Sequence, residues 1–257
     1  MEAIDVLKLR HHPLLALDQS LYSISTAETK KLQKQFVKGI PFAYLTQHSE
    51  FYDHCFYINK DVLIPRSETE LLVDLLVQKA QKQPFNRALD IGTGSGVIML
   101  SLLSKKAVQK GVAADISEEA LKVAKLNAER LRLMSDCEFV LSDRLNNVSG
   151  TFDLIVSNPP YIKQTSHFKL VHGKVDEFEP GLALYLPDEA YTQWFTDFFS
   201  QVALSLEQGG VFMMEGHELE LMDQAQLLRS LKFQDVEVIK DFAGLDRFLM
   251  AKAPLPR

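Results

Sequence analysis

The run Asn158-Pro159-Pro160-Tyr161 directly follows an apolar stretch at 152–157 that predicts a buried strand. Two successive prolines fix φ and remove two backbone donors, so this rigid segment offers mainly hydrogen-bond acceptors. The Asn158 carboxamide oxygen and the Pro159 carbonyl could accept both N–H bonds of a planar –NH2 group, beside the flat ring of Tyr161. The pattern favours a substrate with an amide or amino group. A proline-rich turn at a strand end explains four residues alone about equally well.

A second motif, Gly92-Thr93-Gly94-Ser95-Gly96, lies between an expected strand at 87–91 and an expected helix that begins at Val97. Such a turn lets the backbone approach a ligand closely and presents N–H groups at the start of the helix. The G-x-G-x-G spacing differs from the dinucleotide fingerprint G-x-G-x-x-G, which disfavours NAD. A tight turn without a ligand is the alternative.

Two further expected strands, at 111–115 and 137–141, end at polar residues. Asp115 stands 23 positions after Gly92, a separation at which an acidic side chain reaches ribose hydroxyls in nucleotide-binding folds. Ser117 then predicts the N-cap of a helix. Asp143 and Arg144 follow the second strand. Because open α/β sheets bind ligands outside the carboxyl ends of their strands, we expect these strand ends to share one crevice.

Together these residues resemble class I S-adenosylmethionine-dependent methyltransferases, and more narrowly the protein-(glutamine-N5) methyltransferases that act on peptide chain release factors. The resemblance covers roughly residues 40–252 and includes the segments at 62–70, 178–180 and 241–247. It implies an α/β fold with a seven-stranded Rossmann-like sheet, S-adenosyl-L-methionine as cofactor and a glutamine-bearing loop of a release factor as substrate. The implied catalytic residues are Asn158, Pro159, Pro160 and Tyr161. The implied cofactor-binding residues are Gly92, Thr93, Gly94, Ser95, Gly96, Asp115, Asp143, Arg144 and Asn158.

The sequence departs from the family pattern at several positions. Ser67 replaces a common proline, and Ser67 with Glu70 predicts a capping box at the start of a helix. Arg144 stands where the family often has an aromatic residue near the adenine, and its guanidinium could stack on a purine. The stretch at 185–189 lacks the usual glycine-rich turn, and the region before Ala43 is shorter than the family's helical N-terminal domain.

The resemblance divides the chain into a small helical N-terminal substrate-recognition domain at 1–40, a hairpin linker at 41–64 and a catalytic domain at 65–257. Strands at 50–52 and 55–58 form the expected hairpin. The catalytic domain adds a long irregular segment at 162–187, which we assign to substrate contact. Its expected later elements are helices at 188–207 and 217–232 and strands at 211–215, 235–241 and 247–252, with Gly209-Gly210 ending the first helix. Trp194, Phe195, Phe198 and Phe199 recur at helical spacing and predict core packing. Glu179 either positions the irregular segment or faces solvent, and the resemblance favours positioning.

Composition is typical of a soluble enzyme: 257 residues, 46% hydrophobic and 24% charged. The formal net charge of −6 gives no broad attraction to nucleic acid and suits a basic partner. The seven histidines show no metal-type spacing with Cys55 and Cys137, so no metal is expected. The sequence lacks a signal peptide and a membrane-spanning apolar run, which favours a cytoplasmic protein. We expect a monomer.

Three functions remain open on the sequence alone. The leading one is glutamine N5-methylation of a release factor. The second is methylation of an exocyclic amino group on RNA or DNA, because a base presents the same flat –NH2 to Asn158. A basic stripe would be expected for that function. The third is a non-catalytic cofactor-binding protein that retains the fold.

Overall fold

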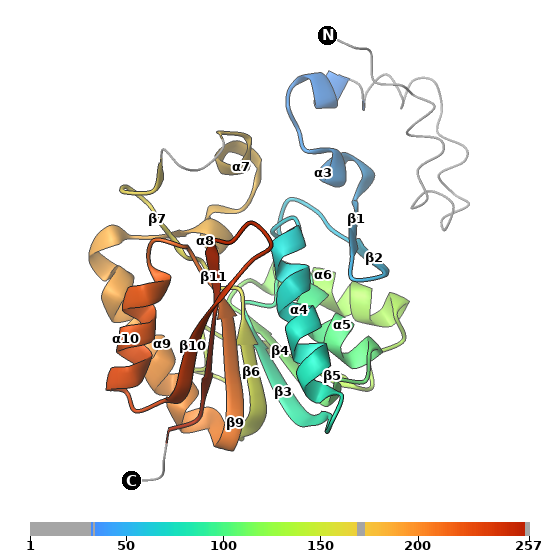
Figure 1. Ribbon diagram of the computed structural model, residues 1–257. Coiled ribbons are helices and arrows are strands. Elements are labelled where there is room, and N and C mark those ends of the chain that lie inside the picture. Colours follow the sequence, from blue (N-terminus) through green and yellow to red (C-terminus); the bar gives the residue numbers. More distant parts are fainter. Residues whose placement is uncertain (1–31, 33, 169–172, 255–257) are drawn as a thin grey trace.

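The computed structural model describes residue 32 and residues 34–168 and 173–254 (Figure 1). Most of the expected domain at 1–40 lies outside these residues. Helices span α3 (Phe42–Thr46), α4 (Ser67–Ala80), α5 (Val97–Ser104), α6 (Glu118–Arg130), α7 (Gly173–Phe178), α8 (Gly181–Leu184), α9 (Tyr191–Ser205) and α10 (Leu221–Ser230), with a 3-10 turn η4 (Asp188–Ala190). Strands span β1 (His48–Phe51), β2 (His54–Tyr57), β3 (Phe85–Ile91), β4 (Val108–Asp115), β5 (Cys137–Leu141), β6 (Phe152–Ser157), β7 (Ile162–Lys163), β8 (Tyr185–Leu186), β9 (Leu206–Glu215), β10 (Gln234–Lys240) and β11 (Asp246–Lys252).

The predicted seven-stranded sheet is confirmed, in the order β10-β11-β9-β6-β3-β4-β5. Strands β5, β4, β3, β6 and β9 run parallel to one another. Strand β11 enters antiparallel between β9 and β10. The chain leaves β3 first towards β4 and later towards β6, so β3 marks the point where the strand order reverses. Ligands bind beside the carboxyl ends of strands at such a point.

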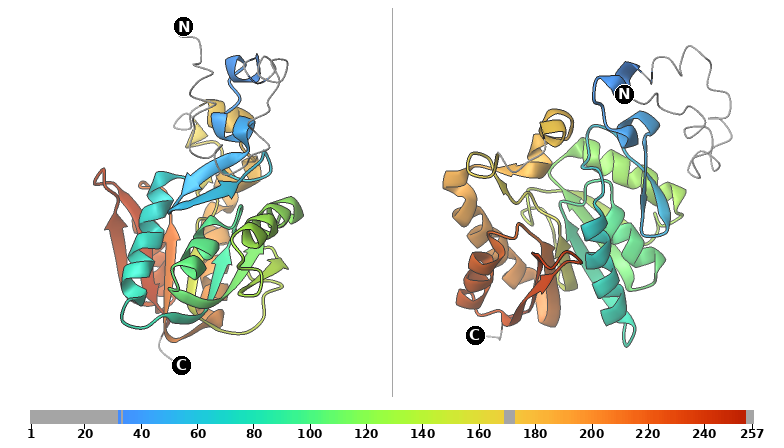
Figure 2. Two further views of the ribbon diagram at one scale, coloured as in Figure 1. Left: turned by 90° about the vertical axis from the view of Figure 1, so that its right-hand side faces the viewer. Right: turned by 45° about the horizontal axis from the view of Figure 1, so that its top comes forward.

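Helices α4, α5 and α6 cover one face of the sheet, and α9 and α10 cover the other (Figures 1 and 2). Strand residues alternate between the two layers because successive side chains point to opposite faces. In β6, Leu154 and Val156 pack with the α4–α5 layer and Ile155 with the α9–α10 layer. Phe152 also packs with the α9–α10 layer, because the strand register shifts between Phe152 and Leu154. Burial on both faces explains why the central strands are almost continuously apolar.

The expected hairpin is formed by β1 and β2, shifted towards the N-terminus by one or two residues at each strand end. Asn127 on α6 fixes it: its Oδ1 accepts from the Tyr57 backbone N–H at 2.7 Å, and its Nδ2 donates to the Tyr57 carbonyl at 2.9 Å. The same Nδ2 donates to the Ser95 carbonyl at 2.9 Å. One buried carboxamide thus ties the hairpin to the glycine turn.

The predicted capping box of Ser67 and Glu70 is wrong. Arg66 is the N-cap residue of α4. Ser67 Oγ donates to Glu68 Oε2 at 3.1 Å, and Glu70 Oε1 accepts from the Tyr52 backbone N–H at 3.3 Å. The docked hairpin therefore takes the carboxylate that local sequence would assign to the cap.

The boundary of α9 also differs from the prediction. The helix ends at Ser205, and β9 runs from Leu206 through Gly209-Gly210. Leu206 is buried and pairs with Phe152 of β6, so sheet pairing ends the helix before the glycines do. The segment at 162–187 is more regular than expected, since β7 pairs with β8 and two short helices, α7 and α8, lie between them. Helix α10 is shorter than the predicted 217–232.

Candidate active site

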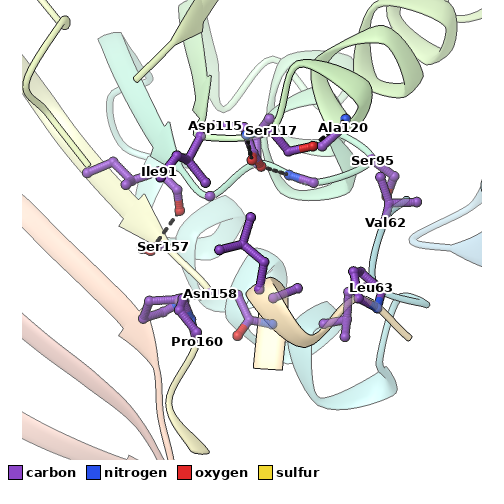
Figure 3. A pocket seen from close by; sticks show the side chains of 18 of the residues that line it. Val62, Leu63, Ile91, Ser95, Asp115, Ser117, Ala120, Ser157, Asn158 and Pro160 are labelled. Atoms are coloured by element: carbon purple, nitrogen blue, oxygen red, sulfur yellow. Dashed lines mark hydrogen bonds between the residues drawn. The ribbon is translucent and has the colours of Figure 1, made fainter. Parts of the chain in front are cut away.

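The carboxyl ends of β3, β4 and β6 open onto a cavity of about 220 Å³. Asp115 and Asn158 face it from different sides, with Val62 and Leu63 on a third (Figure 3). Its walls are mainly apolar with a few polar groups, the composition typical of small-molecule sites. Eight of the nine predicted cofactor residues line the cavity, and Gly96 does not: the eight are Gly92, Thr93, Gly94, Ser95, Asp115, Asp143, Arg144 and Asn158.

The glycine turn connects β3 to α5 at the floor of this cavity. Gly96 is the N-cap of α5 with φ 84°, and a Cβ there would lie 2.9 Å from Leu100 Cδ1. Only glycine combines this backbone angle with such close packing. Gly94 also has a positive φ, and the space where its Cβ would stand is open. A ligand can therefore approach the Gly94 backbone.

Asp115 closes the other side of the turn. One carboxylate oxygen accepts from the Gly94 backbone N–H at 2.8 Å, and the other accepts from the Ser117 N–H at 2.9 Å. Ser117 caps α6 as predicted, because its side chain accepts from the Ala120 N–H at 3.2 Å. Burial raises the pKa of Asp115, and backbone N–H groups oppose that shift. A carboxylate has about four lone-pair positions, so these bonds leave part of its accepting capacity for ligand hydroxyls.

Arg144 is held by its own neighbours. Its Nε and one terminal nitrogen donate to the Asp143 carboxylate, each at 3.2 Å. The guanidinium lies over the Trp194 ring, 5.5 Å from its centroid. Trp194 packs against the α9–α10 core as predicted, but it is half-buried and also lines the cavity, whereas Phe195 and Phe198 are fully buried in that core. Stacking of Arg144 on a purine stays a prediction.

Asn158 stands where the glycine turn meets the end of β6. Ser157 Oγ donates to the Ile91 carbonyl at 2.7 Å and joins the two strand ends (Figure 3). A Cβ added at Gly92 would lie 3.9 Å from the Asn158 carbonyl oxygen. The two sequence motifs therefore meet in space. The Asn158 side chain is oriented by a donated bond from Nδ2 to Thr69 Oγ1 at 3.2 Å.

A second cavity, of about 210 Å³, lies on the other side of Asn158. Asn158 and Pro159 line both cavities, whereas Tyr161 lines the second cavity but not the first. The Tyr161 hydroxyl donates to Glu215 Oε1 at 3.0 Å, and its ring meets His217 edge-on at 6.4 Å between centroids. Burial and the Glu215 charge raise the pKa of Tyr161 well above its usual value, so it stays neutral. The remaining wall is contributed by Leu63, Arg66, Ile162, His167, Val175, Ala183, Leu184 and His217.

Glu179 has a positioning role. Only 6% of it is exposed, and its Oε1 accepts from Arg66 at 2.7 Å. Its Oε2 accepts from the Ile64 backbone N–H at 3.0 Å. Since Arg66 lines both cavities, Glu179 joins their wall to the segment that follows α7.

Two site residues were missed by sequence reasoning. Thr69 and Glu215 are 146 positions apart, yet their side chains share a 2.7 Å hydrogen bond beneath Asn158. Glu215 ends β9 on the same edge of the sheet as Asp115 and Asn158. The position of Glu215 at the end of the strand expected at 211–215 was therefore the sequence feature that could have indicated its place in the site.

Across the described residues, no three His, Cys, Asp or Glu side chains gather as a metal site. No helix within those residues is long and apolar enough to cross a membrane.

Comparisons with known proteins agree with this architecture. Residues 67–177 match the family model of the methyltransferase small domain. A methyltransferase from Pyrococcus furiosus superposes with a TM-score of 0.55 at 19% identity, over 89% of this chain and 98% of that one. A 16S rRNA methyltransferase of Thermus thermophilus, solved with AdoMet and guanosine, gives 0.58 at 18% identity over 80% and 49%. These likenesses confirm the class I methyltransferase fold.

Relatives in sequence are more specific. A release factor glutamine methyltransferase of Bacteroides thetaiotaomicron is 35% identical over 91% of this chain and 84% of its own. A protein with the same name from Nitratidesulfovibrio vulgaris is 35% identical over 84% of this chain and 74% of its own. Another, from Flavobacterium psychrophilum, is 31% identical over 97% of this chain and 88% of its own. On this similarity over most of both sequences, the chain belongs to the release factor glutamine methyltransferase family.

Proposed function

We propose that this protein transfers the methyl group of S-adenosyl-L-methionine to the side-chain amide nitrogen of a glutamine in a peptide chain release factor. The observation that carries the proposal is the position of Asn158 and Pro159, which line both cavities at once. Groups in that position can hold a substrate amide against a methyl donor in the neighbouring cavity. The family membership supports the same reaction.

The first cavity suits the cofactor. Its apolar walls match an adenosyl group, and we assign the glycine turn and Asp115 to the ribose and its neighbouring atoms. Asp143 and Arg144 are assigned to the adenine end. When bound, S-adenosyl-L-methionine supplies an electrophilic methyl group on a sulfonium sulfur.

The second cavity is assigned to the glutamine side chain. An amide nitrogen is a poor nucleophile because its lone pair is delocalised into the carbonyl, so orientation must do most of the work. Asn158 Oδ1 and the Pro159 carbonyl accept the two N–H bonds and aim the nitrogen at the methyl carbon. The same two acceptors stabilise the positive charge that develops on nitrogen. Pro160 keeps the turn rigid, and Tyr161 supplies a flat surface beside the amide.

No side chain within the motif needs to act as a general base. The N–CH3 bond would form as the S–CH3 bond breaks, with S-adenosylhomocysteine as the leaving product. The methylated nitrogen is far more acidic than the starting amide, so it would then lose one proton to solvent water. Burial keeps the Tyr161 hydroxyl protonated, and its bond to Glu215 occupies that proton. The motif therefore orients the substrate and stabilises charge.

For the partner, we propose a release factor protein acting with a monomeric enzyme. Residues 1–40 and the segment at 162–187 are assigned to its recognition. A net charge of −6 favours a basic protein surface over nucleic acid.

The test is methyl transfer from labelled S-adenosyl-L-methionine to the release factors of the same organism, with mass spectrometry to locate the label. The proposal predicts a single methyl group on one glutamine nitrogen. Total RNA and DNA from the same cells serve as competing acceptors. Label on a nucleic-acid base, or cofactor binding without transfer to any glutamine, would refute the assignment.

A further inference from the structure

The two ends of the Asn158 carboxamide are nearly identical in shape, so packing alone does not decide which end faces the substrate. The orienting role requires the oxygen there, because an –NH2 group in its place would oppose the glutamine amide donor to donor. Something in the fold must therefore fix the direction of this side chain.

A chain of buried hydrogen bonds reaches Asn158 from β9. Thr69 Oγ1, in the first turn of α4, donates to Glu215 Oε2 at 2.7 Å, and Asn158 Nδ2 donates to Thr69 Oγ1 at 3.2 Å. Glu215 Oε1 accepts from the Tyr161 hydroxyl at 3.0 Å. Thr69 is 2% exposed and Glu215 is 1% exposed. Solvent is therefore excluded from the bond between Thr69 and Glu215, and the bonds from Asn158 and Tyr161 are partly buried.

The donors and acceptors in this series of hydrogen bonds can be arranged in only one direction. An ionised carboxylate accepts only, so Thr69 must give its single hydroxyl proton to Glu215. The Thr69 oxygen can then only accept from its other neighbour. Asn158 can satisfy it only with its –NH2 end, which leaves Oδ1 facing the cavities.

The charge on Glu215 is supported from β11. Burial raises the pKa of Glu215 above its usual value and Glu68 adds to that rise, whereas the hydrogen bonds that Glu215 accepts from Thr69 and Tyr161, and the Arg247 charge, oppose it. Arg247 is itself fixed by Asp241 at 3.1 Å and by Glu218 at 3.2 Å.

We propose that Glu215, acting through Thr69, is a positioning residue that sets the direction of the Asn158 carboxamide and so its ability to accept from the glutamine amide. The inference rests on the proposed function for its catalytic consequence. Its structural part, the fixed direction of the side chain, stands independently of the acceptor. Glu215 lines neither cavity, whereas Thr69 also lines the first, so the cofactor affinity of each Thr69 variant is measured together with its turnover.

The first test compares Thr69→Val with Thr69→Ser. Valine keeps the shape but removes the hydroxyl, so we expect kcat to fall at least about tenfold at saturating cofactor, with cofactor affinity within about twofold. Serine keeps the hydroxyl and should stay close to the wild type. Val202→Ala, a substitution in the distant α9 core, controls for a general loss of stability. Full activity of Thr69→Val, or an equal loss in Thr69→Ser, would overturn the proposal.

Glu215→Gln tests whether the two residues act in one chain. The substituted side chain keeps the size of Glu215 but carries an –NH2 donor, so Thr69 is no longer forced to give its hydroxyl proton to position 215. We expect kcat to fall at least about threefold in the wild-type background and to change little further in the Thr69→Val background. If the losses in kcat of the two single variants instead multiply in the double variant, Glu215 acts by a route that does not pass through Thr69.

A readout without catalysis separates this inference from the proposed function. The Asn158 side-chain –NH2 signals in an NMR spectrum are assigned by their loss in Asn158→Ala. Their hydrogen exchange should be slow in the wild type and in Thr69→Ser, and at least about tenfold faster in Thr69→Val. Equal exchange in all three proteins would refute the fixed direction, even if no release factor is methylated. A wild-type enzyme that shows the protection but no glutamine methylation would refute the proposed function alone.

Discussion

Replacing Asp115 by alanine is predicted to weaken cofactor binding by a calculable amount. The carboxylate is 8% exposed and already accepts from the Gly94 and Ser117 backbone N–H groups. Its remaining lone pairs are assigned to the ribose hydroxyls. Loss of this charge-assisted acceptor costs about 1–3 kcal/mol. That cost corresponds to a rise of about 5- to 150-fold in Kd.

The same substitution removes the acceptor for two backbone N–H groups, so part of the loss could come from movement of the glycine turn. Calorimetry with S-adenosylhomocysteine and with its 2′,3′-dideoxy analogue separates the two causes. If Asp115 binds the ribose, the analogue binds more weakly than the parent compound to the wild type but about equally to Asp115→Ala. Asp136→Ala, which removes an exposed carboxylate paired with Lys110, should leave both affinities unchanged. Unchanged affinity in folded Asp115→Ala would show that the ribose site is misplaced.

Three further predictions follow from the packing around the two cavities. Gly96→Ala should lower both thermal stability and cofactor affinity, because the new Cβ would meet Leu100 at 2.9 Å at a positive φ; unchanged melting and calorimetry curves would contradict this. Glu179→Ala should raise both KM for the release factor and the cofactor Kd several-fold, since Arg66, which lines both cavities, loses its carboxylate partner. Unchanged values of both would contradict the positioning role. Burial raises the pKa of Asp90 from its usual acidic range to about 7, so the folded state holds this proton more tightly than the unfolded state. The stability that protonated Asp90 contributes is present at low pH and is lost as pH rises towards and through about 7. Denaturant titrations should therefore show the stability of Asp90→Asn rising relative to the wild type between pH 5 and 8, by up to a few kcal/mol. A constant difference in stability between the two proteins across that range would contradict this prediction.

Local sequence carried enough information to place the sheet and most of the cavity. Apolar runs located the central strands, and Asp115 and Asn158 stand at or just after the strand ends where the pattern put them. Ser117 was predicted as a cap from its immediate neighbours alone, and that prediction is confirmed. Such features depend on short-range periodicity and on the rule that parallel strands end together.

Predictions that depended on distant partners were less accurate. Ser67 and Glu70 have the spacing of a capping box, but Tyr52 of the docked hairpin binds the Glu70 carboxylate instead. Trp194 has core spacing, but its position on α9 brings it to the cavity beside Arg144. At Ser67 and Glu70 a tertiary contact overrides a capping preference that is worth only about 1 kcal/mol.

The connection between Thr69 and Glu215 lies further beyond local reasoning. Nothing in either neighbourhood indicates the other residue, and only the packing of α4 against the end of β9 brings them together. A buried carboxylate at a strand end is nevertheless a signal that could be sought, because burial is costly unless such a group is paired.

Turnover of Asn158→Ala at saturating cofactor tests the orienting role most directly. Removal of one preorganised group from a charge-stabilising site lowers the rate by about a hundredfold or more, and we predict at least that loss for glutamine methylation. Cofactor affinity must be measured in parallel, because Asn158 also lines the cofactor cavity. A rate close to that of the wild type on a release-factor glutamine would contradict the two-acceptor mechanism and leave the Pro159-Pro160 turn with a structural role only.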